Sequence, residues 1–259
     1  MTEKRPWHLS DVSLADVRAQ PYQAAVLTFG ATEPHNLHLP HGTDNIEVIE
    51  ICERACAQAW ERGARVALLP NIPFGAEQNV MEFPLAINVE QEILNQIVAS
   101  VAKSLERHGV MKLVIVNGHG GNDFKACLRT LMGRTSVFCC AVNWYGMMAD
   151  EAKKIFEHPG DHADEMETSL ILATAPHLVD MSKADAGAIK QSRFEAVRKG
   201  WVYHPRAFDK LTTNCGVGDP RQASAEKGRK YLEIVTQRLS DFIVELAQAP
   251  MDRDFPFHP

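Results

Sequence analysis

One short stretch of the sequence gathers side chains of the kinds that bind metal ions. Residues 30 to 45 read GATEPHNLHLPHGTDN. The possible ligands in this stretch are Glu33, His35, His38, His41 and Asp44. Imidazole and carboxylate groups without a thiolate suit a catalytic site for Zn, Mn or Fe(II) better than a structural zinc site. The alternative interpretation is a polar loop that caps the following helix and binds no metal.

Two further polar segments could complete such a site. One reads NGHGGND over residues 117 to 123, where glycines leave room for the backbone to approach closely around His119. The other reads DHADEMETS over residues 161 to 169. Its candidate acid, base and ligand groups include His162, Glu165 and Glu167. Together with the first stretch, these segments supply three histidines and several carboxylates from separate parts of the chain.

The elements that position these segments alternate between strands and helices. Short apolar runs, typical of buried parallel strands, occupy residues 24–30, 64–70, 111–118 and 136–145. Helical spacing of apolar residues covers residues 45–62, 88–109, 122–134, 162–175 and 221–248. This alternation predicts an α/β fold, a three-layer α/β/α sandwich with a mostly parallel central sheet. We expect residues 1–259 to form one domain, in which residues 180–220 are rich in loops.

Two of the polar segments directly follow predicted strands. The first predicted strand ends at Gly30, and the third ends in the NGHGGND segment. In an open parallel sheet, ligands bind beyond the carboxyl ends of the strands. We therefore expect both loops to lie at the same edge of the sheet. Thr43 or Asp44 is expected to cap the helix that follows the first loop.

The bulk composition excludes several classes of partner. The formal net charge is -6, and the sequence lacks a basic run of five or more residues, which argues against nucleic acid or an anionic membrane as partner. No apolar run approaches the roughly 18 to 20 residues of a membrane span. The first residues lack the apolar core of a signal peptide, so we expect a cytoplasmic protein. None of the six cysteines forms a CxxC pair, which indicates free thiols in a reducing compartment.

Four motifs, taken in order, resemble those of the creatininase (creatinine amidohydrolase) family. They read GATEPHNLHLPHGTD, NGHGGN, HADEMETS and GVGDPRQASAEKG, and the resemblance covers roughly residues 20 to 235. It implies a creatininase-like α/β/α fold with a site for two divalent metal ions, of which Zn is expected first and Mn or Fe next. It also implies a homo-oligomer, a hexamer, that acts on a small-molecule substrate. The activities implied are hydrolysis of cyclic amides, formamides or peptide bonds.

The resemblance also implies roles for individual residues. Glu33, Asp44 and His119 resemble the ligands of one metal ion, and His35 with the bridging Asp44 resembles ligands of the second. In creatininase itself, the remaining carboxylate follows the histidine of the NGH motif by two residues. That position is Gly121 here, so the carboxylate is missing. We expect Glu165 to replace it.

His162 resembles the active-site histidine of the family, which could polarise a carbonyl or pass a proton to the leaving group. Glu167 is expected either to support the site from behind or to act as an acid or base. His38 and His41 are expected to hydrogen-bond within their loop rather than to bind metal.

The function that follows is hydrolysis of a C–N bond in a cyclic amide, formamide or related small molecule by a water that bridges two metal ions. Creatinine itself is not the expected substrate, since the chain departs from the creatininase pattern at Gly121, Pro34, Asn36 and His41. Three alternatives stay open. The first is a hydrolase of the same fold that acts on a lactone or a cyclic keto-sugar. The second is a phosphate-binding protein, and the third is a metal-stabilised protein without catalysis.

Overall fold

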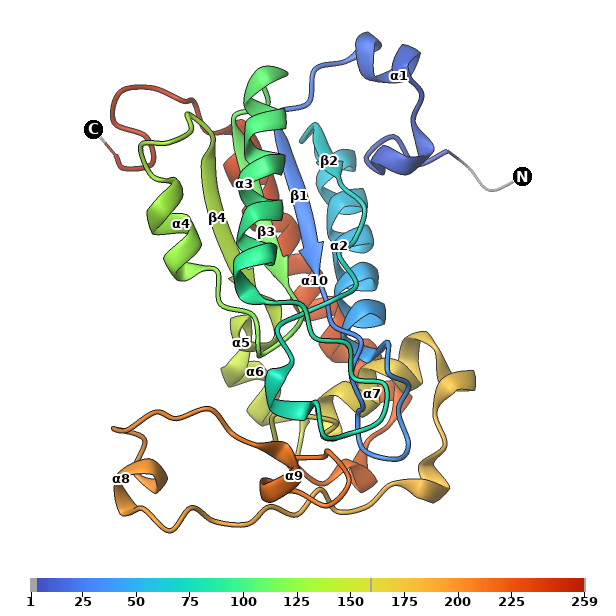
Figure 1. Ribbon diagram of the computed structural model, residues 1–259. Helices are drawn as coiled ribbons and strands as arrows, with labels where there is room; N and C mark the ends of the chain where they lie inside the picture. Colours follow the sequence, from blue (N-terminus) through green and yellow to red (C-terminus); the bar gives the residue numbers. More distant parts are fainter. Residues whose placement is uncertain (1–3, 159, 259) are drawn as a thin grey trace.

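The computed structural model describes residues 4–158 and 160–258, and a four-stranded sheet lies at its centre (Figure 1). The strands are β1 (Ala24–Phe29), β2 (Val66–Leu68), β3 (Lys112–Asn117) and β4 (Phe138–Asn143). Their order across the sheet is β2-β1-β3-β4, and every pair is parallel. Phe29 pairs with Asn117, and Asn117 pairs with Asn143, so the carboxyl ends of three strands are level.

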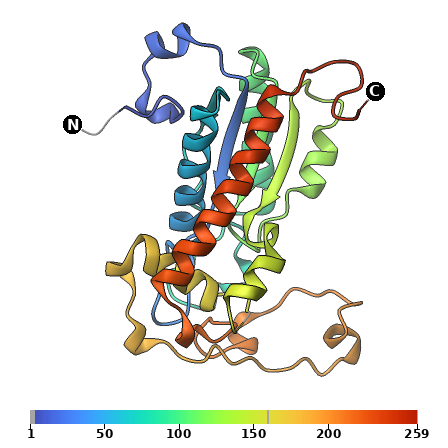
Figure 2. The same ribbon diagram turned by 180° about the vertical axis from the view of Figure 1, so that it is seen from behind.

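Helices cover both faces of this sheet, as the sequence predicts. On one face lie α2 (Thr43–Glu61) and α10 (Ala225–Gln248), and on the other lie α3 (Gln91–Arg107) and α4 (Lys125–Leu131) (Figures 1 and 2). Alternate strand residues point to opposite faces. Val26 and Val114 accordingly pack in the core with α2 and α10, whereas Leu27 and Ile115 pack with α3 and α4. The α/β/α sandwich with a parallel sheet is confirmed.

The remaining helices are short, apart from one that begins within the third polar segment, residues 161–169. That helix is α7 (Glu165–Thr174). The short α-helices are α1 (Leu14–Ala19), α5 (Trp144–Met147), α6 (Ala149–Ile155), α8 (Glu195–Arg198) and α9 (Phe208–Leu211). The 3-10 helices are η1 (Leu9–Asp11), η2 (Gln78–Val80), η3 (Pro176–Leu178), η4 (Met181–Lys183) and η5 (Pro220–Gln222). None of the helices that the structure describes is long and apolar enough to cross a membrane.

Two helix starts differ from the sequence prediction in ways that affect the site. Gly42, and neither Thr43 nor Asp44, is the N-cap of α2, and the Thr43 hydroxyl instead donates to the Pro40 carbonyl. The Asp44 carboxylate is therefore free for other contacts. The helix α7 begins at Glu165 rather than at residue 162, because Asp164 caps it by accepting from the backbone N–H of Met166 and Glu167.

The polar segments gather at the carboxyl ends of the strands, as expected. The loops after β1 and β3, the start of α7 and the segment 180–220 all lie at this end of the molecule (Figure 1). Residues 180–220 contain only η4, α8, α9 and η5 as helices within the described chain, which agrees with the prediction of a loop-rich segment.

Candidate metal centre

The carboxylate of Asp44 lies between two histidine side chains. Its Oδ1 is 2.8 Å from Nε2 of His35, and its Oδ2 is 2.9 Å from Nδ1 of His119. Asp44 is in the first turn of α2, whereas His35 and His119 come from the loops after β1 and β3. All three side chains are buried. One carboxylate thus presents each of its oxygens to a different imidazole, which is the arrangement of a bridging ligand.

Two groups of potential ligands share Asp44. The first group is Glu33, Asp44 and His119, and the second is His35, Asp44 and Glu167. Within each group the ligand atoms lie within 4.8 Å of one another. Glu33 Oε1 is 2.9 Å from His119 Nδ1, and Glu167 Oε2 is 3.8 Å from His35 Nε2. Four of the five residues expected to bind metal therefore lie together: Glu33, His35, Asp44 and His119. The fifth member of this cluster is Glu167, which was not among the expected ligands.

Glu165 requires a correction, because its side chain points away from both groups. Its Oε2 accepts from the backbone N–H of Glu157 at 2.8 Å and of His158 at 2.7 Å, and its Oε1 pairs with Lys227 of α10. Residues two apart on a helix are separated by about 200° around its axis. Once α7 begins at Glu165, the side chain of Glu167 faces the cluster and that of Glu165 faces α10.

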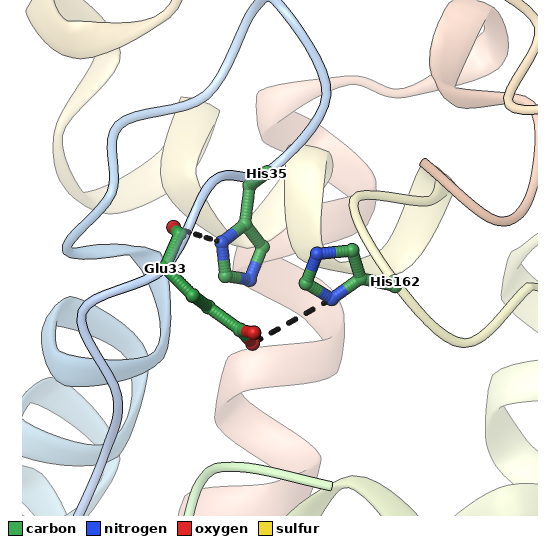
Figure 3. Close-up of side chains that lie close together, drawn as sticks. All are labelled: Glu33, His35 and His162. Atoms are coloured by element: carbon green, nitrogen blue, oxygen red, sulfur yellow. Dashed lines mark hydrogen bonds and ion pairs between the residues drawn. The ribbon is translucent and has the colours of Figure 1, made fainter. Parts of the chain in front are cut away.

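A third group joins His162 to the same cluster. Its ligand atoms belong to Glu33, His35 and His162 and lie within 4.8 Å of one another (Figure 3). His162 Nδ1 is 3.8 Å from Glu33 Oε1, and the rings of His35 and His162 lie 4.2 Å apart between centroids. His162 precedes α7 and pairs with Val217, so helical spacing does not govern where its side chain lies relative to Glu167.

Hydrogen bonds to carbonyl oxygens orient all three imidazoles. His35 Nδ1 lies 3.0 Å from the Glu33 carbonyl, His119 Nε2 lies 3.4 Å from the Ala76 carbonyl, and His162 Nε2 lies 2.9 Å from the Pro34 carbonyl. A carbonyl only accepts, so each of these nitrogens donates its hydrogen. The other nitrogen of each ring consequently faces the carboxylates, which is how metal-ligating histidines are held.

One buried nitrogen requires either a proton or a metal ion between two of these groups. His35 Nε2 has no hydrogen-bond partner among the described residues, although it lies 2.8 Å from Asp44 Oδ1. An imidazole lone pair and a carboxylate oxygen repel each other at this distance unless a proton or a metal ion lies between them. The donor set of imidazole and carboxylate groups fits Zn, Mn or Fe.

The electrostatics of the cluster are consistent with competition between protons and metal ions. Burial disfavours a charged His35, but the adjacent Asp44 raises its pKa to about 10. Burial likewise opposes a charged His119, whose pKa Glu33 and Asp44 raise well above the usual value. Burial and the nearby His35 lower the pKa of His162, which is therefore neutral at neutral pH. Burial raises the pKa of Glu167 to about 8.

The backbone at Gly121 is packed too closely for a side chain at this position. A Cβ atom there would lie 2.2 Å from the Ala76 carbonyl oxygen and 2.4 Å from His119 Nε2. No side chain fits without moving the ring that faces Asp44. Gly121 therefore allows the close packing of His119 against the turn that contains Ala76.

His38 and His41 lie outside the three groups. His38 Nε2 is 2.8 Å from the Thr168 hydroxyl, and His41 Nε2 is 3.1 Å from the Pro84 carbonyl. Both partners lie in other parts of the chain. These histidines therefore connect the loop to neighbouring segments, whereas hydrogen bonds within the loop were expected.

A cavity of about 740 Å³ opens above the cluster. Glu33, Asp44, His119, His162 and Glu167 line its inner part. The rest of the lining, called the outer wall, includes residues without a recognised motif: Gln78, Asn79, Glu92, Tyr145, Tyr203 and Arg206. Phe208 also lines the cavity. The Phe208 ring meets the His162 ring edge-on at 5.4 Å. Residues 203–208 lack a motif, and only the path of segment 180–220 brings them to the cavity.

Comparison with protein families agrees with this geometry. The family model described as creatininase, creatinine amidohydrolase, matches residues 10–243. The chain is 25% identical over 251 residues to creatinine amidohydrolase of Pseudomonas putida, covering 85% of this chain and 88% of that protein. It is 27% identical over 254 residues to 3-dehydro-scyllo-inosose hydrolase of Thermotoga maritima, a match that covers 89% of this chain and 78% of that protein. It is also 27% identical over 219 residues to mycofactocin precursor peptide peptidase of Mycobacterium tuberculosis, a match that covers 79% of this chain and 78% of that protein.

Solved structures with the same fold include a candidate creatinine amidohydrolase from Bacteroides fragilis. That structure matches with a TM-score of 0.90 and 35% sequence identity and covers 97% of this chain and 100% of its own. A manganese form of creatininase has a TM-score of 0.75 at 21% identity, which covers 95% of this chain and 100% of that one and bears on the fold alone.

Proposed function

Because this chain belongs to the creatininase family of amidohydrolase-type hydrolases, we propose that it hydrolyses a C–N bond of a small molecule with two divalent metal ions. The observation that carries this proposal is the position of Asp44, whose two oxygens face His35 and His119 at 2.8 and 2.9 Å. The expected substrate is a cyclic amide, a formamide or a related amide.

The proposed ligand set differs by one residue from the set that the sequence implies. Glu33, Asp44 and His119 would hold one ion, and His35, Asp44 and Glu167 would hold the other. Glu167 takes the place of Glu165, which is engaged with Lys227. Zn is the expected metal, and Mn or Fe suits the same donors. When bound, the two ions would supply a water of lowered pKa and polarise the carbonyl oxygen of the substrate.

The protein's own groups would then move protons and shape the site. Hydrolysis adds the water oxygen to the carbonyl carbon, breaks the C–N bond and needs a proton on the departing nitrogen. His162 donates its Nε2 hydrogen to the Pro34 carbonyl, so its Nδ1 is free to take a proton from water and deliver it to that nitrogen. Phe208 packs against the His162 ring and limits its rotation.

A second substrate class is supported by the outer wall of the cavity. Gln78, Asn79 and Glu92 line it and can hydrogen-bond to hydroxyl groups. A volume of about 740 Å³ is also far larger than one small ring requires. A cyclic keto-sugar or lactone fits these features, and one relative in the family is 3-dehydro-scyllo-inosose hydrolase.

A hydrolysis screen separates these candidates. Purified protein loaded with Zn²⁺, Mn²⁺ or Fe²⁺ is tested on cyclic amides, formamides, lactones and keto-sugars, with His162→Gln as the matched control. Ring opening of a cyclic amide to an amine and a carboxylate, or release of formate and amine from a formamide, supports amide hydrolysis if it needs both metal and His162. Turnover confined to lactones or keto-sugars supports the second class, and no turnover on any of them contradicts both. The hexamer that the family resemblance implies stays a prediction, which analytical ultracentrifugation would test.

A further inference from the structure

Glu77 is a fully buried carboxylate in the loop between β2 and α3, immediately before η2. Its Oε1 accepts from the backbone N–H of Thr32 at 3.1 Å and of Gly75 at 3.3 Å. Thr32 directly precedes Glu33. A single side-chain oxygen therefore links the loop that carries Glu33 to the turn formed by residues 75–77.

The same turn holds the imidazole of His119. The Ala76 carbonyl accepts from His119 Nε2 at 3.4 Å, and the Ala76 N–H donates to Asn122 Oδ1 at 2.9 Å. A Cβ atom at Gly75 would lie 2.8 Å from Cδ2 of the His119 ring, so the turn packs directly against that ring. Residues 75–77 thus contact the supports of both Glu33 and His119.

The chemical state of Glu77 is unusual for a group with only a packing role. Its Oε2 is buried and has no hydrogen-bond partner among the described residues. Burial, with the negative charge of Glu33 nearby, raises the pKa of Glu77 to about 8. A buried carboxyl group of this kind reduces the free energy of unfolding unless its contacts compensate. Glu77 is also absent from the cavity lining, so it acts through its neighbours rather than on a substrate.

We propose that Glu77 is a positioning residue for the group of Glu33, Asp44 and His119. It would hold the loop after β1 and the turn at residues 75–77 at the separation that keeps the Glu33 carboxylate and His119 Nδ1 2.9 Å apart. This inference rests on the two-metal site proposed above. Groups that orient metal ligands in this way typically change metal affinity by about 10- to 100-fold when removed.

The test compares Glu77→Ala with Glu77→Gln, which keeps an acceptor oxygen and nearly the same volume. Glu92→Ala is the matched control, since it removes a carboxylate at the outer wall of the same cavity. Titration of the metal-free proteins with Zn²⁺ measures stoichiometry and affinity. In the Co²⁺-substituted proteins, the hyperfine-shifted N–H signal of His119 Nε2 reports the position of the ring. We expect Glu77→Ala to lower the affinity for one of the two metal ions by about 10- to 100-fold and to shift that signal.

Glu77→Gln and Glu92→Ala should retain both ions and an unshifted signal. The proposal is overturned if Glu77→Ala binds two Zn²⁺ with wild-type affinity, or if Glu77→Gln loses as much affinity as Glu77→Ala. Should Glu77→Ala fail to fold, Asn88→Ala replaces it, because Asn88 Oδ1 accepts from the Glu77 N–H at 2.7 Å. Wild-type Zn²⁺ affinity in that variant would also overturn the proposal. These measurements do not involve hydrolysis, so a failed substrate screen counts against the proposed reaction only.

Discussion

His35 Nε2 and Asp44 Oδ1 lie 2.8 Å apart, yet the nitrogen has no hydrogen-bond partner among the described residues. The Nδ1 of the same ring is engaged with the Glu33 carbonyl at 3.0 Å, so Nε2 faces the carboxylate and would carry either a proton or a metal ion there. On the other side of Asp44, Oδ2 forms a hydrogen bond with Nδ1 of His119 at 2.9 Å. Removal of the Asp44 side chain would therefore affect both groups of possible ligands.

Replacing Asp44 with alanine should remove both metal ions together with activity. Each ion would lose the ligand that it shares with the other, so we expect affinity at both positions to fall by more than about 100-fold, beyond the range typical of supporting residues. Metal content after dialysis, measured by mass spectrometry, checks this. Asp150→Ala, at an exposed carboxylate on α6, serves as control. Full metal content in the Asp44 variant would contradict its bridging position.

Glu167→Gln and Glu165→Gln should have opposite effects. Glu167→Gln should lower the affinity for one of the two metal ions, because Glu167 lies beside His35 and Asp44. Glu165→Gln should leave metal binding intact and instead lower the free energy of unfolding by about 1–3 kcal/mol, since two backbone N–H groups and Lys227 lose a buried charged acceptor. Calorimetric Zn²⁺ titration and urea unfolding measure the two effects. The reverse pattern would restore Glu165 as the ligand.

His162→Gln should lower kcat by about 10²- to 10⁴-fold while two metal ions stay bound. The basis is the free Nδ1 of His162, which can carry a proton to the leaving group. Steady-state kinetics on a substrate found in the screen, together with metal analysis, measure both quantities. Since Glu33, His35 and His162 also form a possible ligand group, loss of an ion in this variant would instead identify His162 as a ligand.

The pH dependence of the metal-free protein should reflect His35. Its pKa is about 10 in the folded protein, above the ordinary value of 6.5, so its contribution to stability is fully present below about pH 6.5 and is lost as pH rises through about 10. Bound metal replaces that proton, so metal affinity should rise over the same range. Thermal unfolding from pH 6 to 10 with and without Zn²⁺ tests this. In His35→Gln, an unchanged decline of Tm with pH would show that another group is responsible.

Two neighbouring glycines offer a matched pair of substitutions. Gly121→Ala should lower the free energy of unfolding by about 1–3 kcal/mol and weaken metal binding, because its Cβ would lie 2.4 Å from His119 Nε2. Gly120→Ala should be close to neutral, since a Cβ there meets nothing within 4 Å. Chemical unfolding and Zn²⁺ titration of both variants check this difference. Equal effects of the two substitutions would argue against close packing at Gly121.

The sequence by itself determined the fold class and most of the cluster. Apolar runs that alternate with helical spacing predict a parallel sheet, and such a sheet brings the ends of β1 and β3 side by side because they are hydrogen-bonded neighbours. Glu33 and His35 follow the end of β1 by four and six residues, and His119 follows the end of β3 by two. Asp44 lies further along, in the first turn of α2. The sequence therefore predicts that these residues lie at one edge of the sheet, and the structure adds that β1 and β3 are paired.

Only the tertiary structure shows that Glu167 is the fifth member of the cluster, which residues form the outer wall, and where Glu77 lies. Glu167 rather than Glu165 faces the cluster because Asp164 caps α7 and His162 pairs with Val217, which lies 55 positions further along the chain. A shift of the helix start rotates every later side chain by about 100° per residue, and residue types alone do not fix that start. Glu77 and Arg206 likewise reach the site through long loops, whose paths depend on packing between distant segments rather than on local sequence.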